Sequence, residues 1–329
     1  MKYAVVALLF LVNTFFAFAD DPQKGVNPKA NPEIPKHKVT VKYMKNTYRV
    51  YKLTEHTVVN RYTTDSVKSN YERDLTYFLT LGVPDPPDAD GFQRLVITID
   101  SLNYKFIADS VKKIDYFTQD ESKRPPRSVD FEAISVPMNR TFTFILSPYG
   151  EVAKIESEDI SVLKDYIEEQ GKNLKKKDAM KKFIWTDGLT DSRLLAIADY
   201  RKIMLPRQPI EKDTIWKTPI SFQIDFKDYS DTLSAKIAEY NGGLYHIEAT
   251  TNKILPSEKE CYFNGVVQTG KVENTEGKGI FKMTINNKGI ITRSEADFEL
   301  INKCKVENET FNEQVTTKMI WDYIGQFTM

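Results

Sequence analysis

The chain has 329 residues, of which 41% are apolar and 28% are charged, and its 46 Lys and Arg residues balance its 46 Asp and Glu residues. This balance argues against nucleic acid and against an anionic membrane surface as the main partner, because both select a surplus of basic residues. The length allows one large or two modest domains with a real hydrophobic core, and 12% aromatic residues, mostly Tyr and Phe, favour β-sheet.

The first 19 residues have the parts of a cleavable signal peptide. Lys2 is the positive start, residues 4–12 are an almost unbroken apolar run, and Ala17 and Ala19 are small residues before the cleavage point. A membrane anchor is the alternative, but the apolar stretch is at the short edge of the roughly 17–25 residues that a helix needs to cross a bilayer. We therefore expect cleavage near Ala19, no stable membrane insertion, and a soluble protein exported to the periplasm or beyond the cell.

Residues 20–38 are predicted to be a flexible leader, because they are rich in Pro, Lys and Asn and have no hydrophobic period. Strand patterns then dominate residues 39–156, where apolar and polar residues alternate in several runs. The alternation changes phase at Asp100 and Ser101, which predicts a turn or a bulge. Ser147–Gly150 separates two strand-like runs and predicts a hairpin. We expect an N-terminal β module over residues 39–156.

The middle of the chain, residues 157–205, changes to a helical period. Ser157 is a suitable N-cap for a first helix that runs to Trp185, although Gly171 weakens the pattern. A second helix is predicted over residues 189–205, where prolines follow and stop it. This helical pair is expected to connect two β modules.

Residues 206–329 return to strand patterns. Apolar and polar residues alternate strictly from Ile220 to Phe226, which is typical of an antiparallel sheet with one solvated face. Asn286–Gly289 is a strong hairpin signal. Both β regions contain a strand, a Gly turn and a returning strand, which indicates two related modules, although any antiparallel hairpin produces this similarity. The predicted fold class is α+β, with mostly antiparallel, curved sheet in two related modules and a helical pair between them.

Cys261 and Cys304 are the only two cysteines, and both lie in the strand-rich C-terminal region. In an exported chain such a pair predicts a disulfide, and two free thiols are the alternative.

The sequence predicts no catalytic residue, no metal site and no cofactor. His37, His56 and His246 are too dispersed to predict a zinc site, and the zinc-peptidase, dithiol and nucleophile-elbow motifs are absent. The aspartates of residues 85–90 do not follow calcium-loop spacing, which favours a solvated turn. A hydrolase with residues dispersed in sequence stays an alternative, because catalytic partners meet only in space. It requires a cleft in which His56 or His246 meets a Ser or a carboxylate.

Three short segments, Ile97–Ser101, Phe144–Val152 and Leu205–Trp216, carry a resemblance to a known family. With them the chain resembles a family of exported bacterial β-rich proteins of unknown function, in which a Gly is usual where this chain has Lys212. More distantly, the chain is similar to half-barrel envelope proteins that carry lipids or lipoproteins on a curved sheet. This second resemblance is an analogy of fold.

A curved sheet covered by helices has a concave apolar face, and such faces bind ligands. The first functional hypothesis is therefore a non-catalytic envelope protein that binds a hydrophobic ligand or an envelope protein. Trp185 and Trp216, on either side of the second predicted helix, are candidates to line the ligand cavity, or they pin that helix to the sheet. The second hypothesis is an interaction or scaffold protein without a small-molecule site, with a sheet interior filled by its own side chains. The oligomeric state is not predicted.

Overall fold

The computed structural model describes residues 36–63, 66–109, 112–174, 179–264, 266 and 268–328. The predicted signal peptide, its cleavage point and most of the predicted leader lie outside the described residues. Within the described part of the chain, no helix combines the length and the apolar character needed to cross a membrane.

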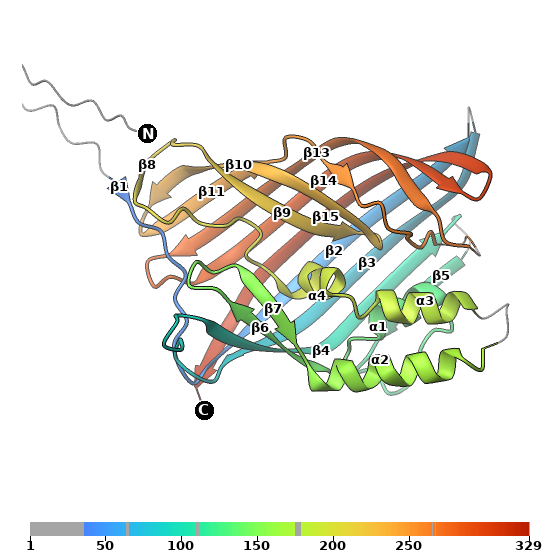
Figure 1. The fold of residues 1–329 in the computed structure, drawn as a ribbon, viewed down its shortest axis with the longest axis horizontal. Coiled ribbons are helices and arrows are strands. Elements are labelled where there is room, and N and C mark those ends of the chain that lie inside the picture. Colours follow the sequence, from blue (N-terminus) through green and yellow to red (C-terminus); the bar gives the residue numbers. More distant parts are fainter. Residues whose placement is uncertain are drawn as a thin grey trace, which may run out of the picture. The chain divides into compact units, whose positions relative to one another are not determined.

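Most of the strands belong to one 13-stranded sheet whose neighbouring strands run antiparallel (Figure 1). Its long central strands are, in spatial order, β13 (Lys271–Asn286), β14 (Ile291–Val306), β15 (Glu309–Thr328), β2 (Thr47–Thr63), β3 (Ser66–Val83) and β4 (Gln93–Ala108). Beyond β13 the order continues with β11 (Leu244–Thr250), β10 (Lys227–Asn241) and β12 (Leu255–Pro256), and beyond β4 with β6 (Thr141–Leu146) and β7 (Val152–Glu156). Two strands pair off this path: β9 (Trp216–Ile224) with β10, and β5 (Lys112–Phe117) with β4. A separate pair joins β1 (Lys36–His37) to β8 (Ile210–Glu211).

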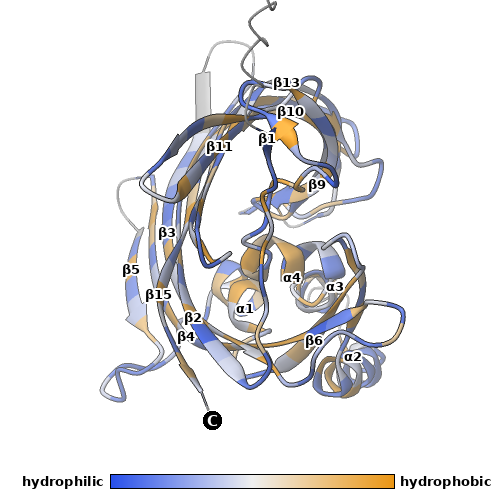
Figure 2. Cartoon of the chain, turned by 90° about the vertical axis from the view of Figure 1, so that its left-hand side faces the viewer, coloured by the Kyte–Doolittle hydropathy of each residue, from blue (hydrophilic) through white to orange (hydrophobic). Residues whose placement is uncertain are grey.

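The large sheet is curved, and its two faces differ in burial. Figure 2 shows the sheet bending around α1 (Val129–Ser135) and α4 (Asp191–Ala198). Along β2 the odd-numbered residues from Thr47 to Arg61 are buried, whereas the residues between them are half-buried or exposed. This period of two arises because successive side chains of a strand point to opposite faces. The predicted α+β class with a mostly antiparallel, curved sheet is confirmed.

The predicted helical pair is three helices in the structure. The first predicted helix is divided into α2 (Glu158–Gly171) and α3 (Ala179–Asp187), and the second is shortened to α4. The N-cap prediction is confirmed, since Ser157 Oγ accepts a hydrogen bond from the Ile160 amide at 3.0 Å. A Cβ on Gly171 would lie 2.4 Å from Lys182 Cδ, so this glycine lets α3 pack closely against the end of α2. The short helix α1 has no counterpart in the sequence prediction.

The predicted turns and the predicted bulge are present. The pairing of β3 with β4 shifts register between Phe78 and Leu79, opposite Asp100, which leaves Asp100 as an extra residue in β4. β6 and β7 pair across Ser147–Gly150, and β13 and β14 pair across Asn286–Gly289.

Strands from both predicted β modules belong to the same sheet. The connection is made by β15 and β2, which pair antiparallel from Thr328 opposite Thr47 to Asn312 opposite Tyr62. The division into two related modules at residues 39–156 and 206–329 stays a prediction.

Candidate functional site

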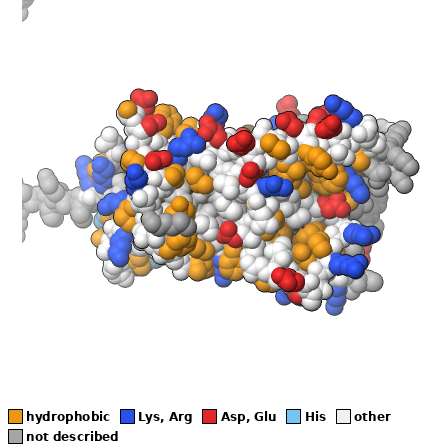
Figure 3. All heavy atoms as spheres, turned by 90° about the horizontal axis from the view of Figure 1, so that it is seen from below, with side chains coloured by type: hydrophobic (Ala, Val, Ile, Leu, Met, Phe, Trp, Pro, Cys, Tyr) orange, Lys and Arg blue, Asp and Glu red, His pale blue; other side chains and the backbone are white. Residues whose placement is uncertain are grey.

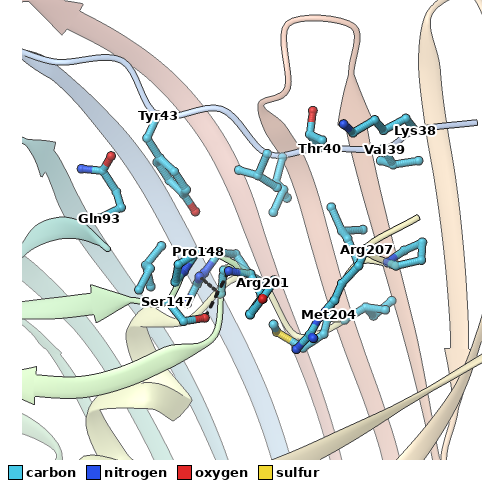
Figure 4. Close-up of a pocket in the computed structure, with 18 of the residues that line it drawn as sticks. Lys38, Val39, Thr40, Tyr43, Gln93, Ser147, Pro148, Arg201, Met204 and Arg207 are labelled. Carbon is cyan, nitrogen blue, oxygen red and sulfur yellow. Dashed lines mark hydrogen bonds between the residues drawn. The ribbon is translucent and has the colours of Figure 1, made fainter. Parts of the chain in front are cut away.

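A cavity of about 710 Å³ lies against one end of the curved sheet (Figure 4). Four segments that are far apart in sequence form its walls: residues 38–43 after β1, residues 87–93 between β3 and the start of β4, the Ser147–Gly150 turn between β6 and β7, and residues 201–208 between α4 and β8. The inner face of the sheet adds Met283 from β13 and Ile291 from β14.

Residues 39–43, here called the strap, are held in place by backbone contacts with the sheet. The Lys42 amide donates to the Gly289 carbonyl at 2.9 Å, and Arg49 Nη2 donates to the Lys42 carbonyl at 2.5 Å. Gly289 has a φ of +76°, and a Cβ on it would lie 2.7 Å from Lys42 Cγ and 3.0 Å from the Thr40 carbonyl oxygen. Only glycine combines this conformation with so close an approach.

The wall of the cavity is mostly apolar. Its buried apolar residues are Val39, Leu146, Ile203, Met283 and Ile291. Met204 and Leu205 add half-buried apolar side chains. An apolar wall with a few placed polar groups is the usual composition of a small-molecule site.

Every charged side chain among the described lining residues is basic. These residues are Lys38, Arg201 and Arg207. Arg201 is buried and already bound, with Nε donating to Asp199 Oδ1 at 2.9 Å and Nη1 donating to the Gly150 carbonyl. Its contact with Gly150 holds the β6–β7 turn at the edge of the cavity.

Arg207 is the more accessible guanidinium. Its side chain is 61% exposed, and the guanidinium carbon Cζ lies 3.6 Å from the centre of the Tyr149 ring. Glu151 is 4.0 Å away and equally exposed to solvent, so this ion pair is weak. Stacking on Tyr149 orients the guanidinium and leaves its donors free for an incoming acceptor.

A further cation, Arg49, lies behind the cavity wall. It is fully buried, and among the described residues no carboxylate forms an ion pair with it. Its guanidinium lies 5.5 Å from the centre of the ring of Tyr43, which lines the cavity. Burial, with the neighbouring Tyr200 hydroxyl, raises the pKa of Tyr43 well above its ordinary value. The Tyr43 hydroxyl therefore stays protonated and remains a hydrogen-bond donor.

The inner face of the sheet also contains a network of buried ion pairs. Its members, here called the ion network, are Glu55, Arg61, Arg73, Asp130, Asp225, Lys227 and Glu313. Arg73 binds Glu55 at 3.0 Å, Asp130 at 3.1 Å and Asp225 at 3.0 Å. Lys227 binds Asp225 at 2.6 Å and Glu313 at 2.9 Å, and Glu313 binds Arg61 at 2.7 Å.

The carboxylates of the ion network are held ionised or bound by their partners. Burial alone raises the pKa of Asp225, but Lys227 and Arg73 outweigh it and hold that pKa well below its ordinary value. The Tyr71 hydroxyl donates to Asp225 at 2.5 Å. For Asp130 burial is the stronger effect and raises its pKa, although Arg73 opposes the shift. Groups so fully engaged hold elements together and are poor candidates for proton transfer.

The sequence did not predict the ion network, because the alternating segment Ile220–Phe226, which contains Asp225, has the pattern of a strand with one solvated face. The alternation along β9 predicts solvent for Gln223 and Asp225, yet both are buried. The β9–β10 turn turns inward, and its two central residues, Asp225 and Phe226, have φ values of +47° and +65°. Asn-Gly is the usual choice for such a turn. Here two non-glycine residues adopt positive φ values, and no pattern in the neighbouring sequence predicts them.

The two tryptophans proposed as ligand-lining are not among the described residues that line this cavity. Trp185 Nε1 donates to Glu132 Oε2 at 3.0 Å, which joins α3 to α1. Trp216 Nε1 donates to the Met204 carbonyl at 2.8 Å, so it supports a residue of the cavity wall. Their direct part in ligand binding stays a prediction.

Cys261 and Cys304 are both buried and both free. With Phe263, Val272 and Val306 they form a small apolar cluster apart from the main core. Burial raises the pKa of Cys261 to about 12 and also raises that of Cys304, so both sulfur atoms are neutral thiols near neutral pH. The structure thus has two free thiols in place of the predicted disulfide, in surroundings that favour the protonated form.

No histidine is among the described residues that line the cavity. His56 Nδ1 is 2.7 Å from Asp74 Oδ1, but both side chains are about half exposed, on the outer face of the sheet. His246 Nδ1 is 3.3 Å from Thr284 Oγ1. The alternative of a dispersed hydrolase requires such a contact inside a cleft, and neither histidine is among the described lining residues.

The fold and the site together define an α+β protein with a curved antiparallel sheet and an apolar, basic cavity at one end. No protein-family model matches the chain, and no curated protein matches its sequence. Among solved structures, a structure of lipovitellin that concerns lipid–protein interactions is similar with a TM-score of 0.45 and 9% identity, over 87% of this chain and 26% of that one. The chain thus spans about a quarter of the lipovitellin chain.

An outer membrane channel from Pseudomonas putida F1 is similar with a TM-score of 0.25 and 7% identity, over 87% of this chain and 98% of the channel. At these scores the likenesses carry no argument about function. Membership in the exported family suggested by the sequence stays a prediction.

Proposed function

We propose that this protein is an exported, non-catalytic envelope protein that binds a hydrophobic ligand in the cavity beside the strap. The observation that carries the proposal is the cavity of about 710 Å³ with a mostly apolar wall. Small-molecule sites commonly have volumes of roughly 300–1,000 Å³. Large side chains of the protein itself, such as Trp321, Tyr77 and Phe142, fill other parts of the sheet interior. A cavity with this volume and an apolar wall provides the room that a hydrophobic ligand needs.

The proposal predicts that filling the cavity abolishes binding. Met204 lies in the wall with a half-buried side chain, so Met204→Trp places a large ring in the space that the ligand needs. We expect Met204→Trp to weaken binding of the neutral fluorophore Nile red by at least about tenfold, because the ligand then loses at least one well-packed apolar contact surface.

Met44→Trp is the matched control, because Met44 is 51% exposed and is not a lining residue. Circular dichroism melting of both variants separates loss of binding from loss of fold. Native mass spectrometry of the protein from its natural host should also find a bound apolar molecule that Met204→Trp lacks. Equal Nile red binding by the two variants would contradict the proposal.

The large side chains that fill parts of the sheet interior also favour the alternative of an interaction protein without a small-molecule site. Such a protein needs a continuous exposed apolar patch. On the face drawn in Figure 3, hydrophobic side chains occur in separate groups with charged side chains between them. The same native mass spectrometry decides between the two functions, because a scaffold retains a protein partner and no apolar ligand.

A further inference from the structure

We infer that the ligand of this cavity is an anionic amphiphile, a molecule with a hydrocarbon chain and a carboxylate or phosphate head. This inference rests on the proposed function and names the class of ligand. It is carried by the charge of the wall, by the position of the two exposed cations Lys38 and Arg207, and by the buried cation Arg49 behind the wall.

The wall has one sign of charge, although the chain as a whole is balanced. The chain has 46 basic and 46 acidic residues, whereas the described lining residues include three basic side chains and no carboxylate. Asp199 balances the charge of Arg201. Glu151 forms only a weak, exposed pair with Arg207, so Lys38 and Arg207 supply the positive charge. A concave, low-dielectric site lined by one sign of charge concentrates the potential within it. An apolar cavity of this kind favours an anion and disfavours a cation of the same size.

The two exposed cations lie on neighbouring segments at the rim. Lys36 and His37 pair with Glu211 and Ile210 in the β1–β8 sheet, which brings residue 38 beside the segment that ends at residue 208. Lys38 and Arg207 are exposed and both line the cavity (Figure 4). A guanidinium stacked on an aromatic ring and a flexible ammonium form a suitable pair for a carboxylate or phosphate.

The apolar part of the wall lies beyond this rim. Leu146, Met283 and Ile291 come from the inner face of the sheet and are almost completely buried. An amphiphile with its head at Lys38 and Arg207 therefore directs its hydrocarbon chain toward the sheet. The buried Arg49, which has no described ion-pair partner, adds positive potential behind the wall without contacting the ligand.

The test uses four ligands with the same hydrocarbon chain and different heads: dodecanoate, dodecyl phosphate, dodecanol and dodecyltrimethylammonium. Displacement of Nile red is measured with each below its micelle concentration. We expect the two anions to bind at least about tenfold more tightly than dodecanol, because a charged hydrogen bond is worth that factor or more. The two anions also distinguish a carboxylate head from a phosphate head.

Arg207→Gln and Lys38→Gln should each reduce the affinity for the anions by about tenfold and leave dodecanol affinity unchanged. Lys212→Gln, which removes a nearby exposed cation outside the lining, should change neither. Added salt should weaken the binding of the two anions and leave the binding of dodecanol unchanged. Arg207 is a surface side chain, so folding is not at risk.

The outcomes separate the two claims. Equal binding of dodecanol and the anions, or preference for the trimethylammonium head, overturns the anionic ligand and leaves a hydrophobic site intact. If none of the four ligands displaces Nile red, and Met204→Trp has no effect, the proposed function itself fails.

Discussion

Lys202 is a buried amine at the end of α4. Its Nζ donates to the Leu195 carbonyl at 2.9 Å and lies 4.8 Å from the centre of the Trp321 ring. Burial lowers the pKa of Lys202 to about 8, more than the nearby Asp199 raises it. The Leu195 carbonyl also accepts a hydrogen bond from the Asp199 amide at 3.0 Å, and at neutral pH the fold must bury the charge of Lys202.

The pKa of Lys202 is lower in the folded state than in the unfolded state. Its contribution to the free energy of unfolding is therefore most favourable at high pH, where the amine is neutral, and is lost as pH falls through about 8. We expect the free energy of unfolding to rise by about 2 kcal/mol from pH 7 to pH 9.5 because of this group. Above about pH 10 the buried tyrosines, whose pKa values are raised, oppose the trend.

Lys202→Met should flatten this rise, as measured by urea unfolding at each pH. Lys318→Met, which removes an exposed lysine of β15, should leave the rise unchanged. A rise that persists in Lys202→Met assigns it to other groups.

At the scale of elements, the strap depends on the β13–β14 hairpin. The backbone of Lys42 and the carbonyl of Gly289 form one hydrogen bond across this junction, and the absence of a side chain at Gly289 permits the contact. The strap forms a wall of the cavity, so a change in the hairpin should affect binding as well as stability.

Gly289→Ala should therefore lower the stability of the fold and weaken ligand binding together. A residue with a Cβ in this left-handed conformation costs about 1–2 kcal/mol, and the collision with Lys42 adds to that cost. Gly242→Ala is the control, because Gly242 has a φ of +56° with nothing within 4 Å of an added Cβ. Gly242→Ala should lower the stability only by the conformational cost of the Cβ, and it should keep Nile red binding. Equal losses in the two variants would mean that the strap contact is unimportant.

At the scale of the whole molecule, the ion network joins distant parts of the chain. Arg73 on β3 reaches Glu55 on β2, Asp130 on α1 and Asp225 in the β9–β10 turn, all in the interior. A buried ion pair adds little over a well-packed apolar pair, but removal of one partner leaves an uncompensated charge. The network thus specifies where α1 and the inward turn sit against the sheet.

Arg73→Met should destabilise the fold by about 3–5 kcal/mol, because it leaves three carboxylates without their shared cation. The control is Arg94→Met, which removes an exposed pair with Glu156 and should cost less than about 1 kcal/mol. Denaturant unfolding at neutral pH measures both. Similar small losses in both variants would show that the interior repacks around the missing guanidinium.

Much of the fold could be predicted because strand patterns are local. The alternation along β2, the phase change at Asp100 and the Ser157 cap all correspond to observed features. The division of the first predicted helix into α2 and α3 was not predicted, although Gly171, which weakens the helical pattern, is where α2 ends. The free state of Cys261 and Cys304 is likewise a property of the tertiary structure that their positions in sequence do not give.

The sequence by itself determined the class of the fold, the turns and the near absence of chemical motifs, because periodicity, turn residues and caps act over a few neighbouring positions. Only the tertiary structure decided the cavity and the ion network. Lys38, Arg207 and Met283 form one wall, and Arg73 and Asp225 form one ion pair, although each set is spread over much of the chain. The contacts that create both features are long-range. Whether a charged side chain is buried, and so needs a charged partner, depends on these contacts and not on its neighbours in sequence.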